Sequence, residues 1–352
     1  MRKLNFLIVL IAANLLISNA ATAQNQKKSY QIACVGFYNL ENLFDYWDDT
    51  LIRDEEYLPD GAKGWDSTRY VTKLEHMSRV ISEIGTKYTP DGAAVLGVCE
   101  VENKGVLEDL VNMPSIKDRN YKIVHYDSPD ARGVDVGLLY QEKYFKVKNS
   151  TKYPLNFQDD DGKVRHTRDQ LVVTGEMQGE DVSIIVCHWP SRWGGQKASE
   201  PRRVEAAKVS RRIIDSLQTL NADSKIILMG DLNDDPVNVS MTEYVRAKGK
   251  KGKLKKGDLY NTMWDHYKKG NGTLAYRDAW NLFDQIVITQ PFLKEDATKY
   301  ILHVAEVYSQ PYMIQQEGQY AGYPLRTHAG GKWTNGYSDH FPSYIILKKY
   351  AN

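Results

Sequence analysis

The sequence predicts an α/β sandwich whose β-sheets are covered by a small number of helices. Short runs of β-branched and aromatic residues recur along the chain, as in a protein made mainly of strands. Several runs are apolar at both alternating positions, which is typical of strands buried on both faces. Helical periodicity is clear in only two segments. Because no internal repeat or long Pro/Ser linker divides residues 24–352, we expect them to form a single domain.

The predicted strands are each bounded by polar or turn-forming residues. In chain order they are Tyr30–Phe37, Ala93–Val98, Tyr121–Tyr126, Val134–Tyr140, Gln170–Thr174, Val182–Cys187, Lys225–Met229, Phe283–Thr289, Leu302–Val307 and Tyr344–Leu347.

Two segments have the apolar spacing of amphipathic helices. The first is expected to stop at Gly85, because glycine adopts the left-handed conformation that often follows a helix. Its apolar residues are Val71, Leu74, Met77, Ile81 and Ile84. The second is expected to begin after Ser199, whose hydroxyl group suits an N-cap. Its apolar residues are Val204, Ala207, Ile213, Ile214 and Leu217.

Residues 1–23 have the pattern of a cleaved signal peptide. Arg2 and Lys3 precede a mostly apolar stretch from Leu4 to Ile17, and Ala21-Thr22-Ala23 offers small residues for cleavage. An uncleaved anchor is the alternative, but the stretch is short for a membrane-spanning helix. We therefore expect an exported protein, periplasmic or extracellular, with no stable membrane anchor after cleavage.

Charge and cysteine content restrict the function classes. The 46 basic and 45 acidic residues exclude a uniformly basic nucleic-acid-binding protein, although a local basic groove stays open. One basic run, residues 246–256, is either a solvated loop or a loop that faces phosphate. Cys34, Cys99 and Cys187 each lie in an apolar run, so we expect buried free thiols and no disulfide framework. The commonest NTPase and serine-hydrolase motifs are absent from the sequence.

Polar residues that could carry chemistry cluster where the apolar strands end. Taken singly, each cluster has an ordinary explanation: residues 231–236 could be only a turn, and a lone histidine is more often structural. An EF-hand interpretation of that segment fails, because Pro236 and Thr242 replace the required glycine and glutamate. The clusters are residues 37–45, 98–103, 187–192, 228–236, 283–286 and 338–342.

The order of these clusters is more specific than any one of them. It comprises an Asn after the first strand, a strand-end Glu, a strand ending in His, Gly-Asp-x-Asn, an Asp opening a late strand, and Ser-Asp-His near the end. In this chain they are Asn39, Glu100, His188, Gly230-Asp231-Leu232-Asn233, Asp284 and Ser338-Asp339-His340. From about Ile32 to Leu347 the chain thus resembles the endonuclease/exonuclease/phosphatase superfamily, the deoxyribonuclease I-like fold. The opening Phe-Tyr-Asn-Leu-Glu-Asn-Leu-Phe-Asp resembles a secreted bacterial branch.

The resemblance implies a four-layer sandwich of two mostly antiparallel β-sheets flanked by helices, with the site at one rim. Phosphoester hydrolysis requires anionic charge to be neutralised, a water to be activated and a leaving oxygen to be stabilised. Carboxylate and amide oxygens favour Mg²⁺ or Mn²⁺ over zinc. Glu100 is the foremost candidate metal ligand, with Asn39, Glu41 and Asp339 in support.

By resemblance, Asp231 and Asn233 position the attacking water and the phosphate. His340, paired with Asp284, would act as a proton-transfer group or phosphate ligand. His188 would contact the scissile phosphate or assist the leaving group. Which of Asp231 and His340 is the general base stays open.

The leading hypothesis is a monomeric, divalent-metal-dependent phosphoesterase, foremost an endonuclease-type phosphodiesterase acting on DNA or RNA. Basic residues after His188, with Arg192 as candidate substrate-binding residue, favour nucleic acid; Trp189, Trp193 and Trp333 could stack on bases or pack in the core. A phosphatase or phosphodiesterase for inositol phosphates or phospholipids is the first alternative, because the same residues serve both. A catalytically silent binding protein on this scaffold is the second.

Overall fold

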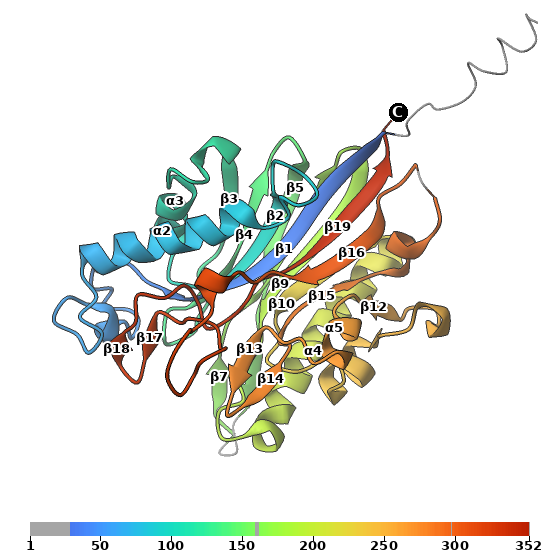
Figure 1. The fold of residues 1–352 in the computed structure, drawn as a ribbon. Helices are drawn as coiled ribbons and strands as arrows, with labels where there is room; N and C mark the ends of the chain where they lie inside the picture. The colour runs from blue at the N-terminus through green and yellow to red at the C-terminus, as the bar shows by residue number, and fades with distance from the viewer. Residues whose placement is uncertain (1–28, 159–161, 297, 352) are drawn as a thin grey trace, which may run out of the picture.

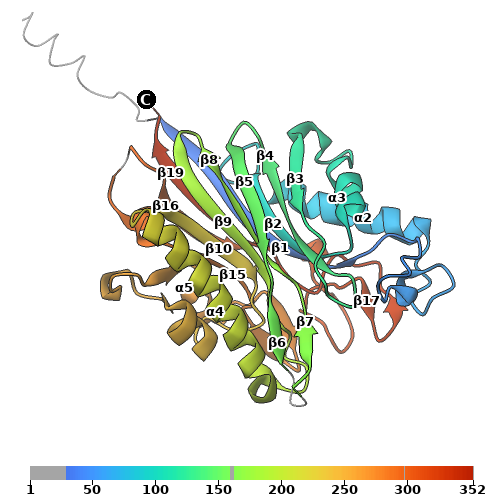
Figure 2. The same ribbon diagram turned by 180° about the vertical axis from the view of Figure 1, so that it is seen from behind.

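The computed structural model describes residues 29–158, 162–296 and 298–351. The predicted signal peptide therefore lies outside the described residues. Within them, two large β-sheets pack face to face, and helices lie on both outer faces (Figures 1 and 2). The predicted α/β sandwich is confirmed. None of the described helices is both long and apolar enough to cross a membrane.

The first large sheet has six strands in the order β16-β19-β1-β2-β4-β3. Strands β1 and β2 run parallel, and all other neighbours in this sheet are antiparallel. The strands are β1 (Tyr30–Leu43), β2 (Ala93–Val101), β3 (Tyr121–His125), β4 (Asp135–Gln141), β16 (Ile301–Val307) and β19 (Ser343–Tyr350).

The second large sheet has seven strands in the order β11-β12-β15-β10-β9-β8-β5, with parallel pairs β9–β10 and β11–β12. They are β5 (Phe145–Tyr153), β8 (Gln170–Met177), β9 (Glu180–His188), β10 (Lys225–Asp231), β11 (Ala247–Lys248), β12 (Leu259–Asn261) and β15 (Asp284–Ile288). Three small hairpins join β6 (Asn156–Gln158) to β7 (Val164–His166), β13 (Leu274–Tyr276) to β14 (Ala279–Asn281), and β17 (His328–Ala329) to β18 (Lys332–Trp333).

Two helices cover the first sheet and one long helix covers the second (Figures 1 and 2). The α-helices are α2 (Ser67–Glu83), α3 (Lys104–Val111), α4 (Gln196–Leu220) and the short α5 (Trp264–Lys268). Single 3₁₀ turns lie at Glu55–Tyr57, Lys117–Arg119, Lys251–Lys253, Gln290–Leu293 and Pro311–Met313, and a π-helical turn lies at Ser240–Val245.

The central strands are buried on both faces, as their apolar sequences predict. In β1, Val35 and Phe37 point between the sheets, whereas Cys34 and Tyr38 point toward the helices. The same division in β9 and β10 makes a third apolar layer under α4. Cys34, Cys99 and Cys187 are buried free thiols, so that expectation is confirmed.

The predicted start of the second helix is wrong. The helix begins at Gln196, and Ser199 lies within its first turn. The Ser199 hydroxyl donates to the Gly195 carbonyl at 2.7 Å, so it bonds backward instead of accepting an N–H as a cap would. The first helix is as expected at its end, since Gly85 has a φ of 78°.

Strand direction brings the polar clusters to one rim of the sandwich. The parallel strands β1 and β2 end together, so Asn39 lies beside the residue that precedes Glu100. In the second sheet, Asp231 pairs with His188 on one side and with Asp284 on the other. Residues distant in sequence thus meet at the junction of the two sheets.

Candidate active site

The backbone at this rim leaves regular strand geometry. Glu41, Asn42, Glu100 and Asn233 have φ angles of 47°, 52°, 58° and 50°. Such left-handed conformations are uncommon for residues other than glycine and concentrate at functional sites. The register shifts at residues 39–43 and 99–101, which makes these positions bulges that redirect side chains.

An amide connects two carboxylates at the centre of the site. Asn39 Nδ2 donates to Glu100 Oε1 at 3.3 Å and to Asp231 Oδ2 at 3.1 Å, and so bridges the two sheets. The backbone N–H of Asn42 donates to Glu100 Oε2 at 3.1 Å. In this arrangement Asn39 presents its amide nitrogen to the carboxylates; its direct ligation of a metal stays a prediction.

His188 faces the same two carboxylates. Its Nε2 lies 3.6 Å from Glu100 Oε1 and 3.8 Å from Asp231 Oδ2. Burial, and then the positive charges of Arg168, Arg132 and His340, hold the pKa of His188 well below its ordinary value. The ring is therefore neutral at physiological pH, as a metal-binding imidazole must be.

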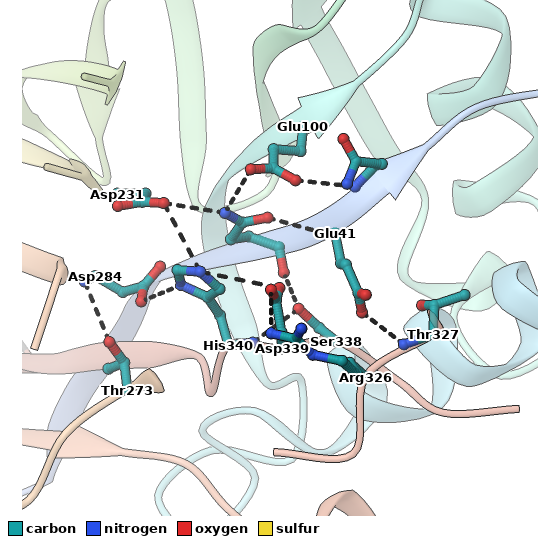
Figure 3. Close-up of polar contacts among 12 residues, drawn as sticks. Glu41, Glu100, Asp231, Thr273, Asp284, Arg326, Thr327, Ser338, Asp339 and His340 are labelled. Carbon is teal, nitrogen blue, oxygen red and sulfur yellow. Dashed lines mark hydrogen bonds and ion pairs between the residues drawn. The ribbon is translucent and has the colours of Figure 1, made fainter. Parts of the chain in front are cut away.

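His340 has the opposite electrostatic environment. Its Nδ1 lies 2.7 Å from Asp284 Oδ2, and its Nε2 lies 3.9 Å from both Asp231 Oδ2 and Asp339 Oδ1 (Figure 3). Burial alone would lower the pKa of His340, but Asp284 first, then Asp231 and Asp339, raise it well above its ordinary value. The structure thus confines an imidazolium beside the carboxylates.

Asp231 stands between the two histidines. Burial raises the pKa of its carboxyl group to about 7, against the opposing charge of His340 and with further contributions from Asp284 and Glu100. Its Oδ1 accepts the backbone N–H of Asn233 at 3.0 Å. Oδ2 therefore remains turned toward the site, and the group is poised to exchange a proton near neutral pH.

Asn233 and Arg192 belong to the loops beside this centre. The Asn233 amide donates to the Trp189 carbonyl at 2.9 Å. The Arg192 guanidinium donates to the Asn233 carbonyl at 2.9 Å and to Asp235 at 3.1 Å, and it stacks on Phe283. These contacts fix the turn that carries Asn233; substrate binding by Arg192 stays a prediction.

The structure brings Asp339 to the site but turns Glu41 aside. Asp339 Oδ2 accepts from Arg326 at 2.9 Å, and its other oxygen faces His340. The Glu41 carboxylate instead accepts the backbone N–H of Thr327 at 2.7 Å (Figure 3). Burial and then Asp339 raise the pKa of Glu41 to about 7, against Lys73. In this conformation the Glu41 carboxylate binds the loop at Thr327, and its ligation of a metal stays a prediction.

The residues present fit a divalent cation. One ligand atom each from Glu100, His188 and Asp231 lies within 4.8 Å of the others, and the same holds for Asp231, Asp284 and His340. A protonated imidazole cannot ligate a metal, which disfavours the group that contains His340. Carboxylate oxygens with one neutral imidazole suit a divalent ion at the first group.

Sequence reasoning missed two supporting residues. Arg168 donates to the Trp189 carbonyl at 2.7 Å, the same carbonyl that binds Asn233, and also to Asp130 at 3.0 Å. Ser338 was expected only as part of a motif, yet its hydroxyl donates to the Asn39 carbonyl at 2.8 Å. Arg168 has no sequence signal, whereas Ser338 sits within the Ser-Asp-His cluster.

Comparisons with known proteins show the family and the fold. A family model described as the endonuclease/exonuclease/phosphatase family matches residues 34–349. No curated protein sequence matches the chain. A solved endonuclease/exonuclease/phosphatase family protein from Bacteroides thetaiotaomicron is 15% identical, with a TM-score of 0.53 over 92% of this chain and 97% of that one.

Two further solved structures share the fold. A mannosyl-6-phosphatase from Bacteroides thetaiotaomicron is 17% identical, with a TM-score of 0.53 over 90% of this chain and 99% of that one. TDP2 from D. rerio, complexed with single strand DNA product, is 15% identical, with a TM-score of 0.52 over 90% and 99% of the two chains.

Proposed function

Because the chain belongs to the endonuclease/exonuclease/phosphatase family and is a phosphoester hydrolase of that superfamily, we propose that it is a divalent-metal-dependent phosphodiesterase that cleaves nucleic acid. One observation carries the hydrolytic part. Nε2 of His188 and Nε2 of His340 lie 3.8 Å and 3.9 Å from the same oxygen, Oδ2 of Asp231. One oxygen of a carboxylate with a raised pKa therefore lies near both a neutral imidazole and an imidazolium.

Glu100 would hold Mg²⁺ or Mn²⁺ through its carboxylate, with Asp231 at the border of the ion's site and the His188 imidazole beside it. When bound, such an ion neutralises phosphate charge and acidifies water. The chain's own residues supply the rest. Asp231 accepts the proton of the attacking water at Oδ2, since its pKa of about 7 suits a general base near neutral pH.

His340 is already cationic and is therefore the phosphate-binding group, not the base. Asp284 holds its Nδ1–H, so Nε2–H points toward the space beside Asp231 and Asp339. A cation fixed at that point stabilises charge that grows on the phosphoryl oxygens in the transition state. This division of roles supports Asp231 as the base.

Exposed indole rings favour a nucleic-acid substrate. Trp193, in the loop after β9, is 78% exposed, and Trp47, in the loop after β1, is 68% exposed. Both loops leave the rim that carries the site, and indoles stack on bases without sequence preference. Of the other tryptophans considered, Trp189 is buried in the core, and Trp333 packs against Trp65.

A small phosphomonoester, such as a sugar or inositol phosphate, is the second candidate. Two of the basic residues that favour a nucleic-acid substrate in the sequence are not free to bind its phosphates. Arg192 binds its own loop, and the buried Arg203 lies 2.7 Å from Asp234. The lysine run, residues 246–256, lies away from the site. The Lys255 carbonyl accepts a hydrogen bond from Gln290, which follows the last residue of β15, whereas Asp284 at the site is the first residue of that strand. A site with few free cations suits a compact substrate, and a mannosyl-6-phosphatase is among the structural neighbours.

A substrate panel tests the proposal. The purified protein is incubated with single-stranded DNA, plasmid DNA, RNA, sugar phosphates, inositol phosphates and phospholipids, with Mg²⁺, Mn²⁺ or chelator, beside Glu100→Gln as the control. We expect chelator-sensitive cleavage of polynucleotide. Hydrolysis of the small phosphates alone would select the second candidate, and metal-independent hydrolysis would contradict the mechanism.

We also propose that the protein is exported after removal of residues 1–23. The support is the sequence pattern of that segment. Mass spectrometry of the protein recovered from its cells and medium tests this: an N-terminus at Gln24 is expected, and an intact N-terminus retained in the cytoplasm would contradict it.

A further inference from the structure

A lysine is buried in the core face of α2. Lys73 has no exposed surface, and its neighbours along the helix face, Tyr70, Leu74 and Met77, belong to the hydrophobic core. Its Nζ donates to the Thr327 hydroxyl at 2.5 Å and to the Tyr337 carbonyl at 2.6 Å. Burying an ammonium group costs several kcal/mol unless partners compensate. These two contacts, together with the negative charges of Glu41 and Asp339, compensate that cost.

Glu41 binds the backbone of Thr327, the residue whose hydroxyl binds Lys73. The Glu41 carboxylate accepts the N–H of Thr327 at 2.7 Å, and the Glu41 N–H donates to Asn39 Oδ1 at 2.9 Å. Thr327 is therefore bound through its side chain by α2 and through its backbone by β1. The Thr327 hydroxyl also contacts the Tyr337 carbonyl at 3.3 Å. Residues 327–337, which include β17 and β18, thus form a loop closed at its base.

The closed base leads directly into the active site. After Tyr337, the Ser338 hydroxyl donates to the Asn39 carbonyl at 2.8 Å and accepts the His340 N–H at 3.1 Å. Asp339 and His340 follow without an intervening element. Only Ser338 and Asp339 separate Tyr337 from His340, so the position of the Tyr337 carbonyl fixes where the segment that carries the imidazole begins.

We propose that Lys73 is a positioning residue of the active site: by holding Thr327 and Tyr337 together at the base of the loop, it fixes where Asp339 and His340 stand. The inference rests on the proposed hydrolytic function for its catalytic consequence. Lys73 acts only through the loop, and a displacement of about 1 Å at a reacting group can cost about 10²-fold in rate.

The chain offers a matched control at the other end of the sandwich. Lys225 is also a buried lysine, and its Nζ donates to Glu180 and to the Tyr300 carbonyl, each at 2.6 Å. It opens β10, whereas Asp231 closes that strand at the active-site rim. Lys73→Met and Lys225→Met each remove two hydrogen bonds of a buried lysine, one next to the site and one far from it. Lys225→Met also removes an ion pair with Glu180, so it is the more severe change for folding.

The experiment compares the two variants with the wild type in three measurements: thermal melting, kcat against KM with the best substrate of the panel, and hydrogen–deuterium exchange of the metal-free protein. Both variants should have a lower melting temperature than the wild type. Only Lys73→Met should lower kcat, by about 10-fold or more with KM little changed, because the reacting groups are displaced. Only Lys73→Met should accelerate amide exchange in residues 327–338.

Thr327 gives a milder test if Lys73→Met does not fold. Thr327→Val removes one hydroxyl contact and should lower kcat, while Thr327→Ser keeps the hydroxyl and should behave like the wild type. An unchanged kcat and exchange rate in Lys73→Met, or equal losses in Lys225→Met, would overturn the inference. An inactive wild type would instead contradict the proposed function, and the exchange measurement would still decide whether Lys73 holds the loop.

Discussion

Nδ1 of His340 lies 2.7 Å from Oδ2 of Asp284, although 56 positions separate the two residues and their strands belong to different sheets. His340 precedes β19 of the first sheet, and Asp284 opens β15 of the second. The contact can form only after the two sheets have packed together. The electrostatic character of the site is therefore a product of the whole sandwich.

The His340–Asp284 pair should act as a unit. His340→Ala should slow the chemical step by about 10²-fold or more, because it removes the cation beside the phosphate. Asp284→Asn should cause a smaller loss, and the double variant should be no slower than His340→Ala. Single-turnover rates measure all three, and additive losses would show that the residues work separately.

Glu100 should control metal affinity. Glu100→Gln removes a charged ligand and keeps one of the two hydrogen bonds that the carboxylate accepts, from Asn39 or from Asn42, because one of its oxygens becomes an NH2 donor. The change also removes the repulsion between Glu100 and Asp231, which offsets the loss. We expect Mn²⁺ binding, measured by calorimetry, to weaken by about 10-fold or more, with the melting temperature of the metal-free protein little changed. Glu108→Gln, on the exposed side of α3, is the control. Equal affinities in wild type and Glu100→Gln would place the ion elsewhere.

Asp231 and His340 should each make the metal-free protein less stable as pH rises, whereas His188, whose pKa is lowered, contributes in the opposite direction below pH 6.5. Burial raises the pKa of Asp231 from 3.8 to about 7, so the folded protein binds this proton more tightly than the unfolded chain does. The stability that Asp231 contributes is therefore lost as the pH rises from 3.8 to about 7. The pKa of His340 is also raised, so the stability that His340 contributes is lost as the pH rises above 6.5.

Thermal melts in chelator at several pH values test this sign. The decrease of melting temperature with pH should be shallower in Asp231→Asn than in the wild type. Added Mg²⁺ should stabilise the protein more at pH 8 than at pH 5, because metal binding requires the deprotonated carboxylate of Asp231. A dependence of stability on pH that is the same in Asp231→Asn as in the wild type would contradict the raised pKa assigned to Asp231.

The lysine run should be dispensable for catalysis. Since it lies at the end of the second sheet away from Asp284, replacing Lys250, Lys251 and Lys253 by serine should leave turnover of a short oligonucleotide unchanged. The salt dependence of polynucleotide binding should also keep its slope. A flatter slope would show that phosphates reach this loop.

Trp193 should contribute to the binding of polynucleotides and not to the binding of small phosphates. Stacking on an aromatic ring contributes about 1–3 kcal/mol per base, so Trp193→Ala should raise KM for single-stranded DNA by about 5-fold or more. Tyr244→Ala, which removes an exposed ring that packs against Lys208 of α4, is the control. Equal effects on a sugar phosphate and on DNA would argue against base stacking.

The buried strands could be predicted because both of their faces are apolar, and each predicted strand is present. β5 escaped prediction for a physical reason. It is an edge strand of its sheet. Only Phe145 is buried in it, and Lys146, Lys148 and Lys152 are exposed, so apolar periodicity is weak.

The order of polar motifs predicted which residues meet at the rim, but not how they point. The direction of Glu41 depends on a left-handed backbone in a bulge, which the sequence does not encode visibly. Lys73 did give a signal, a charge within an apolar helical stripe. Its partner Thr327 is 254 positions away, so the meaning of that signal required the fold.

The first and last strands of the domain also have a practical consequence. Tyr30 pairs with Tyr350, and their rings stack with centroids 5.0 Å apart, so both ends of the domain emerge at one corner of the sandwich (Figure 1). From that corner β1 runs to Asn39 over about 30 Å, at about 3.3 Å per residue. A fluorescent label, a bead or a fused protein attached at either end would therefore leave the catalytic rim open to solution, and a short linker between the ends would suit a circular permutant.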